Sequence, residues 1–146
     1  MKIVVTGGAG FIGSNLVDYL VKKKHKVIVI DNFSTGLKNN LKLSQKKVKI
    51  INKDISHNNN LDRIFKGVDY VFHLAGLAEI IPSIKNPKKY FINNVHGTIN
   101  VLEASKKVKI KKFIYAASSS CYGEPKKFPT PENDNFPIFS SSINKE

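Results

Sequence analysis

Three glycines stand three residues apart near the start of the chain, within Lys2–Ser14, KIVVTGGAGFIGS. The turn can be described as Gly7-x-x-Gly10-x-x-Gly13 or as Gly8-x-Gly10-x-x-Gly13. One glycine permits a tight turn, another leaves the backbone open to a pyrophosphate, and the third lets the next helix pack closely on its strand. The N-terminus of that helix offers unpaired N–H groups to an anion. The pattern predicts a dinucleotide site, and a plain tight turn is the competing interpretation.

A carboxylate follows the next apolar run. Val27-Ile28-Val29-Ile30 predicts a second strand, and Asp31 stands at its end. This is close to the spacing expected for an acid that binds the adenosine ribose hydroxyls. A carboxylate accepts two hydroxyl hydrogens and would repel a 2′-phosphate, so the residue favours NAD over NADP. The alternative is that Asp31 only caps a turn.

The elements that must position these residues alternate between strands and helices. This alternation predicts an α/β fold of the Rossmann type, a doubly wound parallel sheet of about five strands. The expected strands are Lys2–Thr6, Lys26–Ile30, Val48–Asn52, Tyr70–Leu74 and Lys112–Ala117. The expected helices are Phe11–Lys23, a weak one over Asn60–Lys66, a long one after Pro87 that Gly97 could bend, and a short one within the polar stretch, around Leu37–Leu43.

Length and composition set further bounds. With 146 residues the chain is one domain. We expect residues 1–120 to form an NAD-binding Rossmann domain and residues 121–146 to form a Pro-rich polar loop and a frayed tail. A single cysteine, Cys121, excludes an internal disulfide framework. With no apolar run long enough to span a membrane and no evident signal peptide, a cytoplasmic location without membrane partners is expected.

The formal net charge of +13 raises the hypothesis of a nucleic-acid partner. The basic residues, however, are 23 lysines and one arginine, Arg63. Proteins that read bases or grip phosphates usually include arginine forks. The lysines are also scattered along the chain and follow no known nucleic-acid-binding motif. The sequence therefore disfavours this partner.

Several smaller groups stand where such a sheet would bind its ligand, at the carboxyl ends of strands. They are His73-Leu74-Ala75-Gly76, Asp54-Ile55, Asn93-Asn94 and the run from Ala116 to Gly123, AASSSCYG. Each has an ordinary structural explanation when taken alone. His73 in particular is expected to be a hydrogen-bonded core histidine and not a catalyst.

Taken together, these motifs resemble a known family. TGGAGFIGS, DNFSTG at Asp31–Gly36, HLAG, NNVHGT at Asn93–Thr98 and AASSSCYG are very similar to the extended short-chain dehydrogenase/reductases. Within that family the chain looks like the nucleotide-sugar 4-epimerases of the UDP-glucose and UDP-N-acetylglucosamine type, with a sister dehydratase as the alternative. The resemblance extends to about Ile138.

The resemblance implies roles for individual residues. By this resemblance, the pyrophosphate is held by Gly7, Gly10, Phe11, Ile12 and Gly13. The adenosine ribose is held by Asp31 and Asn32, with Ser34, Thr35 and Gly36 nearby, and the adenine by Asp54 and Ile55. The rest of the cofactor is lined by Leu74, Ala75, Gly76 and Asn93. Ser118 matches the serine that hydrogen-bonds the sugar hydroxyl being oxidised, and Ser119 is assigned to the substrate beside it. No metal is implied.

The family mechanism also requires a tyrosine that is acidified by a lysine four residues on, and that removes a proton as hydride passes to NAD. Two pairs have this spacing, Tyr19 with Lys23 and Tyr122 with Lys126. The first belongs to the far end of the first helix, and the second encloses a glycine and a proline. Neither matches the family position. We therefore expect a truncated, N-terminal part that lacks the catalytic pair and the C-terminal substrate domain and is inactive alone.

Three hypotheses follow for the function. The chain is the NAD-binding part of a nucleotide-sugar epimerase, or a non-catalytic cofactor-binding module that completes a partner chain, or a basic nucleic-acid-associated protein. The resemblance also implies a homodimer, with the helix after Pro87 as the candidate interface. An uncovered sheet edge predicts marginal stability or aggregation, unless dimerisation or a partner covers it.

Overall fold

The computed structural model describes residues 1–57, 60–118, 122 and 127–131. The chain divides into two compact units, Met1–Tyr115 and Ala116–Glu146. The first unit holds all the strands and helices named below. Most of the predicted tail over 121–146 lies outside the described residues.

Five parallel strands form one sheet in the first unit. They are β1 (Lys2–Thr6), β2 (Lys26–Asp31), β3 (Lys49–Asn52), β4 (Tyr70–His73) and β5 (Lys112–Tyr115), in the order β3-β2-β1-β4-β5. This order confirms the predicted doubly wound sheet, because the chain winds outward from β1 first to one side and then to the other. The predicted strands are all present, and only their ends differ, by one or two residues.

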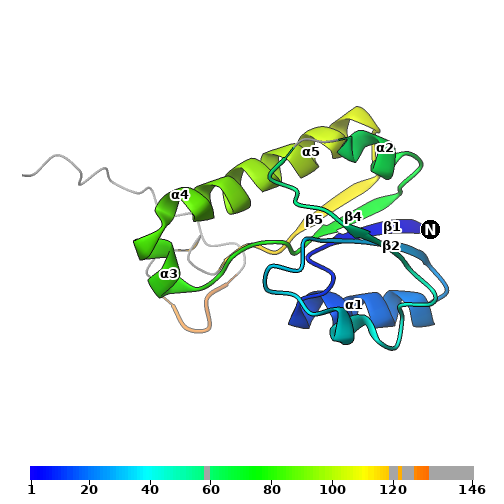
Figure 1. Ribbon diagram of the computed structural model, residues 1–146, viewed down its shortest axis with the longest axis horizontal. Helices are drawn as coiled ribbons and strands as arrows, with labels where there is room; N and C mark the ends of the chain where they lie inside the picture. Colours follow the sequence, from blue (N-terminus) through cyan, green and yellow to red (C-terminus); the bar gives the residue numbers. More distant parts are fainter. Residues whose placement is uncertain (58–59, 119–121, 123–126, 132–146) are drawn as a thin grey trace, which may run out of the picture. The chain divides into compact units, whose positions relative to one another are not determined.

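The core is divided between the two faces of the sheet. Along β1 the side chains alternate, with Ile3 and Val5 packed in one cluster and Val4 in the other. Helix α1 (Phe11–Lys22) covers the first cluster, while α2 (Leu61–Phe65) and α5 (Gly97–Lys107) cover the second. Figure 1 shows α1 on one side of the sheet and α2 with α5 on the other. Burial on both faces explains why the interiors of β1 and β2 are apolar without alternation, Ile3–Val5 in β1 and Val27–Ile30 in β2.

The long helix predicted after Pro87 is a continuous helical run of three parts. These are α4 (Pro87–Tyr90), the π-helix η2 (Phe91–His96) and α5. Gly97 does not interrupt this run, because it has helical dihedral angles, φ −56° and ψ −46°. Its missing side chain serves packing, since a Cβ there would lie 3.1 Å from the Ile55 side chain.

Two shorter helices complete the unit. The 3₁₀-helix η1 (Lys38–Leu41) falls where a short helix was expected. Helix α3 (Ile80–Lys85) was not predicted, because it is six residues long and contains Pro82. Its isoleucines Ile80, Ile81 and Ile84 are all exposed. Within the described part of the chain, no helix is long and apolar enough to cross a membrane.

Candidate functional site

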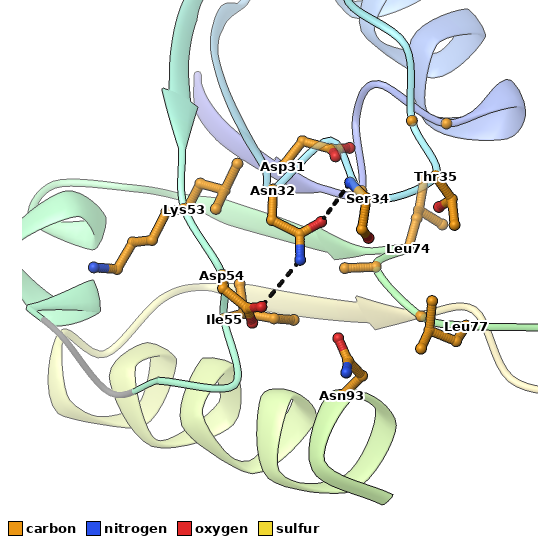
Figure 2. Close-up of a pocket in the computed structure, with 16 residues that line it drawn as sticks. Asp31, Asn32, Ser34, Thr35, Lys53, Asp54, Ile55, Leu74, Leu77 and Asn93 are labelled. Atoms are coloured by element: carbon orange, nitrogen blue, oxygen red, sulfur yellow. Dashed lines mark hydrogen bonds between the residues drawn. The ribbon is translucent and has the colours of Figure 1, made fainter. Parts of the chain in front are cut away.

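A pocket opens at the carboxyl ends of β1 to β4, the edge where parallel sheets of this order bind ligands. Figure 2 shows the side chains that surround it. Thirteen of the residues predicted to bind a cofactor line it, namely Gly7, Gly10, Asp31, Asn32, Ser34, Thr35, Gly36, Asp54, Ile55, Leu74, Ala75, Gly76 and Asn93. Ile30, Lys53 and Leu77 also line it, although the sequence interpretation did not name them.

The three missed residues could have been found from the strand rule alone. Ile30 and Lys53 stand at or just past the ends of β2 and β3, and Leu77 lies in the segment that follows β4. The side chain of Lys53 extends away from the other lining groups (Figure 2). Lys53 therefore lines the pocket without directing its charged end toward the other lining residues.

The remaining pyrophosphate candidates lie in the first turns of α1. The side chains of Phe11 and Ile12 are 84% and 68% exposed, and Gly13 is buried. A Cβ on Gly13 would lie 2.1 Å from the carbonyl oxygen of Gly7, so no other residue fits without moving the helix. Gly13 therefore acts by letting α1 approach the turn, as expected for the last glycine of the pattern.

Gly7 allows a second close approach. It has φ +68°, a left-handed conformation that favours glycine. A Cβ there would lie 2.6 Å from the backbone nitrogen of Ala75. The glycine turn and the segment after β4 thus meet backbone to backbone, which leaves a smooth floor for a flat or anionic ligand.

Asp31 ends β2 with its carboxylate held from two sides. Its Oδ2 accepts from the Ala9 backbone N–H at 2.9 Å, and its Oδ1 accepts from the Phe33 N–H at 2.8 Å. The carboxylate is buried, with 8% of the residue exposed. Each oxygen keeps a further lone pair, so the group can still accept from the hydroxyls of a ribose. The capping and ligand-binding interpretations of Asp31 are therefore compatible.

Asn32 and Asp54 join the ends of two strands. Asn32 Nδ2 donates to Asp54 Oδ2 at 3.0 Å, and Asn32 Oδ1 accepts from the Ser34 N–H at 3.0 Å (Figure 2). Burial raises the pKa of the Asp54 carboxyl, but hydrogen bonds from Ser56 and Asn32 outweigh it and hold that pKa below its usual value. Asp54 is thus an ionised acceptor at neutral pH, on the side of the pocket predicted for the adenine.

His73 is a core histidine, as predicted. It is 1% exposed, and its Nδ1 lies 2.6 Å from Thr6 Oγ1 while its Nε2 lies 2.9 Å from Thr98 Oγ1. Thr98 donates its hydroxyl hydrogen to the Asn94 carbonyl, so Nε2–H must donate to Thr98 and Nδ1 must accept from Thr6. The neutral imidazole therefore joins β1, β4 and the long helix beneath the pocket.

Burial lowers the pKa of His73 from 6.5 to about 4, which predicts acid-sensitive stability. Between pH 4 and pH 6.5 the His73 imidazole is protonated in the unfolded chain but neutral in the folded chain. The stabilisation that comes from the neutral histidine is therefore complete above pH 6.5 and is lost as the pH falls toward 4. The loss amounts to about 3 kcal/mol. Urea unfolding at pH 7 and pH 4.5 measures it. His73→Gln should remove this part of the pH dependence, and an equal dependence in the variant would contradict the assignment.

The residues fit a dinucleotide on the evidence of their own geometry. Glycines stand where a Cβ would collide with backbone, unpaired helical N–H groups begin beside Gly10, and a buried carboxylate with free lone pairs lies across the pocket. In residues 1–57, 60–118, 122 and 127–131, no three His, Cys, Asp or Glu side chains are grouped so as to hold a metal ion.

The predicted catalytic and substrate serines lie in the second unit. Ser118 is exposed at its start, and Ser119 lies outside the described residues. The Tyr19–Lys23 pair is at the end of α1 opposite the glycine turn, where the Lys23 ammonium lies 5.6 Å from the centre of the Tyr19 ring. This agrees with its exclusion as the catalytic pair.

Comparison with known proteins identifies a family. The profile of the NAD dependent epimerase/dehydratase family matches residues 3–142. A UDP-N-acetylglucosamine 4-epimerase from Methanobrevibacter ruminantium, solved with UDP-N-acetylmuramic acid, is 41% identical with a TM-score of 0.84, and the match covers 95% of this chain and 44% of that one. A UDP-glucose 4-epimerase from Bifidobacterium longum, solved with NAD⁺ and UDP, is 32% identical with a TM-score of 0.85, covering 94% and 43%.

A relative with another named activity is equally similar. UDP-glucuronic acid decarboxylase 1 of Arabidopsis thaliana is 41% identical over 134 residues, which are 90% of this chain and 29% of that protein. The chain spans less than half the length of the curated relatives it matches. The sheet order, the glycine turn, the carboxylate after β2 and the profile match agree, and the chain belongs to the NAD dependent epimerase/dehydratase family.

Proposed function

We propose that this chain is the NAD-binding part of a UDP-sugar 4-epimerase. The observation that supports this most directly is the buried carboxylate of Asp31, held by two backbone amides at the end of β2 and facing the glycine turn. In sheets of this order that position binds the adenosine ribose. The epimerases solved with nucleotides share this architecture.

In this proposal the chain binds and orients NAD, which supplies a hydride acceptor when bound. The turn from Gly7 to Gly13 holds the pyrophosphate with Phe11 and Ile12 of the first helical turn. Asp31 and Asn32 hold the ribose, with Ser34, Thr35 and Gly36 beside them, and Asp54 and Ile55 hold the adenine. Leu74, Ala75, Gly76 and Asn93 line the remainder, and Ser118 and Ser119 contact the sugar.

The epimerase reaction itself is a proposal for the whole protein. The family's tyrosine and lysine have no counterpart at the expected position in these 146 residues. Since a decarboxylase is as similar to this chain as an epimerase is, identity over this half does not select the reaction. We infer that these residues bind the cofactor and that turnover requires groups supplied by further sequence or by a second chain.

Calorimetric titration of the chain with NAD and with NADP tests the cofactor proposal. We expect NAD to bind and NADP to bind more weakly, because the 2′-phosphate would face the Asp31 carboxylate. A folded sample, verified by circular dichroism, that releases no heat with NAD would refute the proposal.

We also propose that the chain forms a homodimer through its long helix. Apolar side chains recur along one stripe of that helix, with exposed fractions of 53% for Phe91, 41% for Val95, 49% for Ile99 and 43% for Leu102. An exposed apolar stripe on a helix indicates a protein partner. A second copy presents the same stripe, and a two-fold axis lets the two pack together.

Ile99→Glu tests this surface. A charge at the centre of an apolar interface, introduced from both copies, is expected to weaken dimerisation by about a hundredfold or more. Sedimentation equilibrium measures the change. Leu43→Glu is the control, because Leu43 is 83% exposed but follows η1, which packs beside α1 on the other side of the sheet. Equal effects of the two substitutions, or a wild-type chain that is monomeric, would contradict the proposal.

A further inference from the structure

Two asparagines of the long helix hold the two loops that form opposite walls of the pocket. Asn94, in η2, contacts the segment after β4, and Asn100, in α5, contacts the segment after β3. Neither side chain lines the pocket. From the sequence, Asn94 was named only within the Asn93-Asn94 pair, with no role of its own, and Asn100 was not named. We propose that Asn94 and Asn100 are positioning residues that set these walls for the dinucleotide, an inference that rests on the proposed NAD site.

The Asn94 carboxamide pairs with one peptide of the wall segment. Its Oδ1 accepts from the Leu77 N–H at 2.8 Å, and its Nδ2 donates to the Leu77 carbonyl at 2.9 Å. Rotating the carboxamide by half a turn would set donor against donor and acceptor against acceptor, so its orientation is determined. Leu74 follows the end of β4 and still donates its N–H to the Thr6 carbonyl at 3.1 Å, and the segment from Ala75 to Leu77 lies beyond this bond. Asn94 thus replaces the strand partner that this segment lacks.

Asn100 holds the opposite wall through carbonyl groups. Its Nδ2 donates to the Ile55 carbonyl at 2.9 Å and to the Ser56 carbonyl at 3.0 Å. Ile55 lines the pocket, and the Ser56 N–H in turn donates to Asp54 Oδ1 at 2.8 Å. Displacing this loop would therefore move both Ile55 and the Asp54 carboxylate.

The helix itself is fixed to the sheet between the two asparagines. Thr98 donates to the Asn94 carbonyl at 2.6 Å and accepts from His73, which accepts from Thr6 of β1. Asn93 and Asn94 lie in the π-helix, a form found frequently at functional sites, and there neighbouring residues serve the pocket and its wall. One anchored helix thus sets the distance between the walls.

The order of the strands assigns a different half of the dinucleotide to each wall. β2 and β3 lie on one side of β1, and β4 lies on the other. The adenosine half binds over the side that carries Asp31 and Asp54, and the pyrophosphate crosses at the glycine turn. The other half then extends over the segment after β4. Asn100 therefore supports the adenosine wall and Asn94 the wall of the second ribose and nicotinamide.

The test compares NAD with AMP, which has only the adenosine half, in the full chain. For Asn94→Ala we expect NAD affinity to fall about tenfold with AMP affinity unchanged. For Asn100→Ala we expect both affinities to fall by the same factor. Ser105→Ala is the matched control, because it removes one buried hydrogen bond within the same helix, to the Val101 carbonyl, and should change neither. Calorimetry measures the affinities.

A general loss of structure would lower both affinities together, so the NAD-selective loss in Asn94→Ala distinguishes positioning from instability. In Asn100→Ala both affinities are expected to fall, so an unchanged midpoint of thermal unfolding makes this distinction, and a lowered midpoint would overturn the role of Asn100. Equal effects of Asn94→Ala on NAD and AMP, or no effect on either, would overturn the assignment. Amide hydrogen exchange without nucleotide provides an independent measurement. The Leu77 amide should exchange at least about tenfold faster in Asn94→Ala and not in Asn100→Ala. If the wild-type chain binds no NAD, the proposed function fails. Unchanged exchange of the Leu77 amide in Asn94→Ala would separately refute the role of Asn94 in holding the segment after β4.

Discussion

Asp31→Asn is expected to weaken NAD binding by about a hundredfold and to lower the free energy of unfolding by about 2 kcal/mol. The carboxylate accepts from the N–H groups of Ala9 and Phe33, one on each oxygen. Asparagine has the same shape but presents an NH₂ to one of these donors, which leaves a buried N–H unsatisfied. It also removes the charge that would receive the ribose hydroxyls. Calorimetry with NAD and urea unfolding at pH 7 measure the two effects.

Asp62→Asn is the matched control. It is the same change in a carboxylate that pairs with Lys107 at 2.7 Å, on the far helices α2 and α5. That lysine is 71% exposed, and exposed ion pairs contribute at most about 1 kcal/mol. NAD affinity should therefore stay at the wild-type value. If Asp31→Asn bound NAD as tightly as Asp62→Asn does, Asp31 would be a capping residue only. A smaller preference for NAD over NADP in Asp31→Asn would further support its contact with the ribose.

Gly13→Ala is expected to lower the free energy of unfolding by about 3 kcal/mol. The added Cβ would lie 2.1 Å from the Gly7 carbonyl oxygen and 2.8 Å from the Gly8 Cα. Both obstacles are backbone atoms of the turn, so relief requires α1 to move away from the sheet. The movement would separate Val17 and Leu20 from their core cluster. For a chain of this size the midpoint of thermal unfolding should fall by about 10 °C, as calorimetry can measure.

Gly10→Ala provides the contrast within the same motif. Its Cβ would meet only the Gly7 carbonyl oxygen, at 3.3 Å, and its backbone is extended, with φ −72°. The fold should therefore tolerate alanine with a change of less than about 1 kcal/mol. Gly10 lines the pocket, so NAD binding should still be lost. If Gly13→Ala and Gly10→Ala lowered the free energy of unfolding equally, it would be wrong to assign packing to Gly13 and ligand binding to Gly10.

The fold and much of the site were predictable because they follow from local patterns. Apolar runs of three and four residues marked β1 and β2, and glycine spacing marked the turn before α1. The motifs at Asp31–Gly36 and Asn93–Thr98 then pointed to six of the sixteen residues that line the pocket. Helix α3 was missed because it is only six residues long and contains Pro82, so its isoleucines span too few turns to indicate a helix.

Contacts between distant residues account for what was missed. Neither the pairing of Asn94 with Leu77 nor that of Asn100 with Ile55 leaves a trace in either residue's own neighbourhood, since an asparagine looks the same whether it is solvated or bonded to a loop. Gly97 shows the same limit, because local propensity suggests a bend, while in the fold this glycine continues the helix and a Cβ there would crowd the Ile55 side chain.

Periodicity and glycine spacing along the chain were therefore sufficient to predict a doubly wound sheet, its strand boundaries to within two residues and the carboxylate at the end of β2. These features depend on residues that are neighbours in sequence. Only the tertiary structure decided three other features. These are the two pocket walls held by Asn94 and Asn100, the neutral state of His73, and the different roles of Gly10 and Gly13. Each of these depends on a distance between atoms whose residues, apart from the glycines of one turn, lie 17 or more positions apart in the chain.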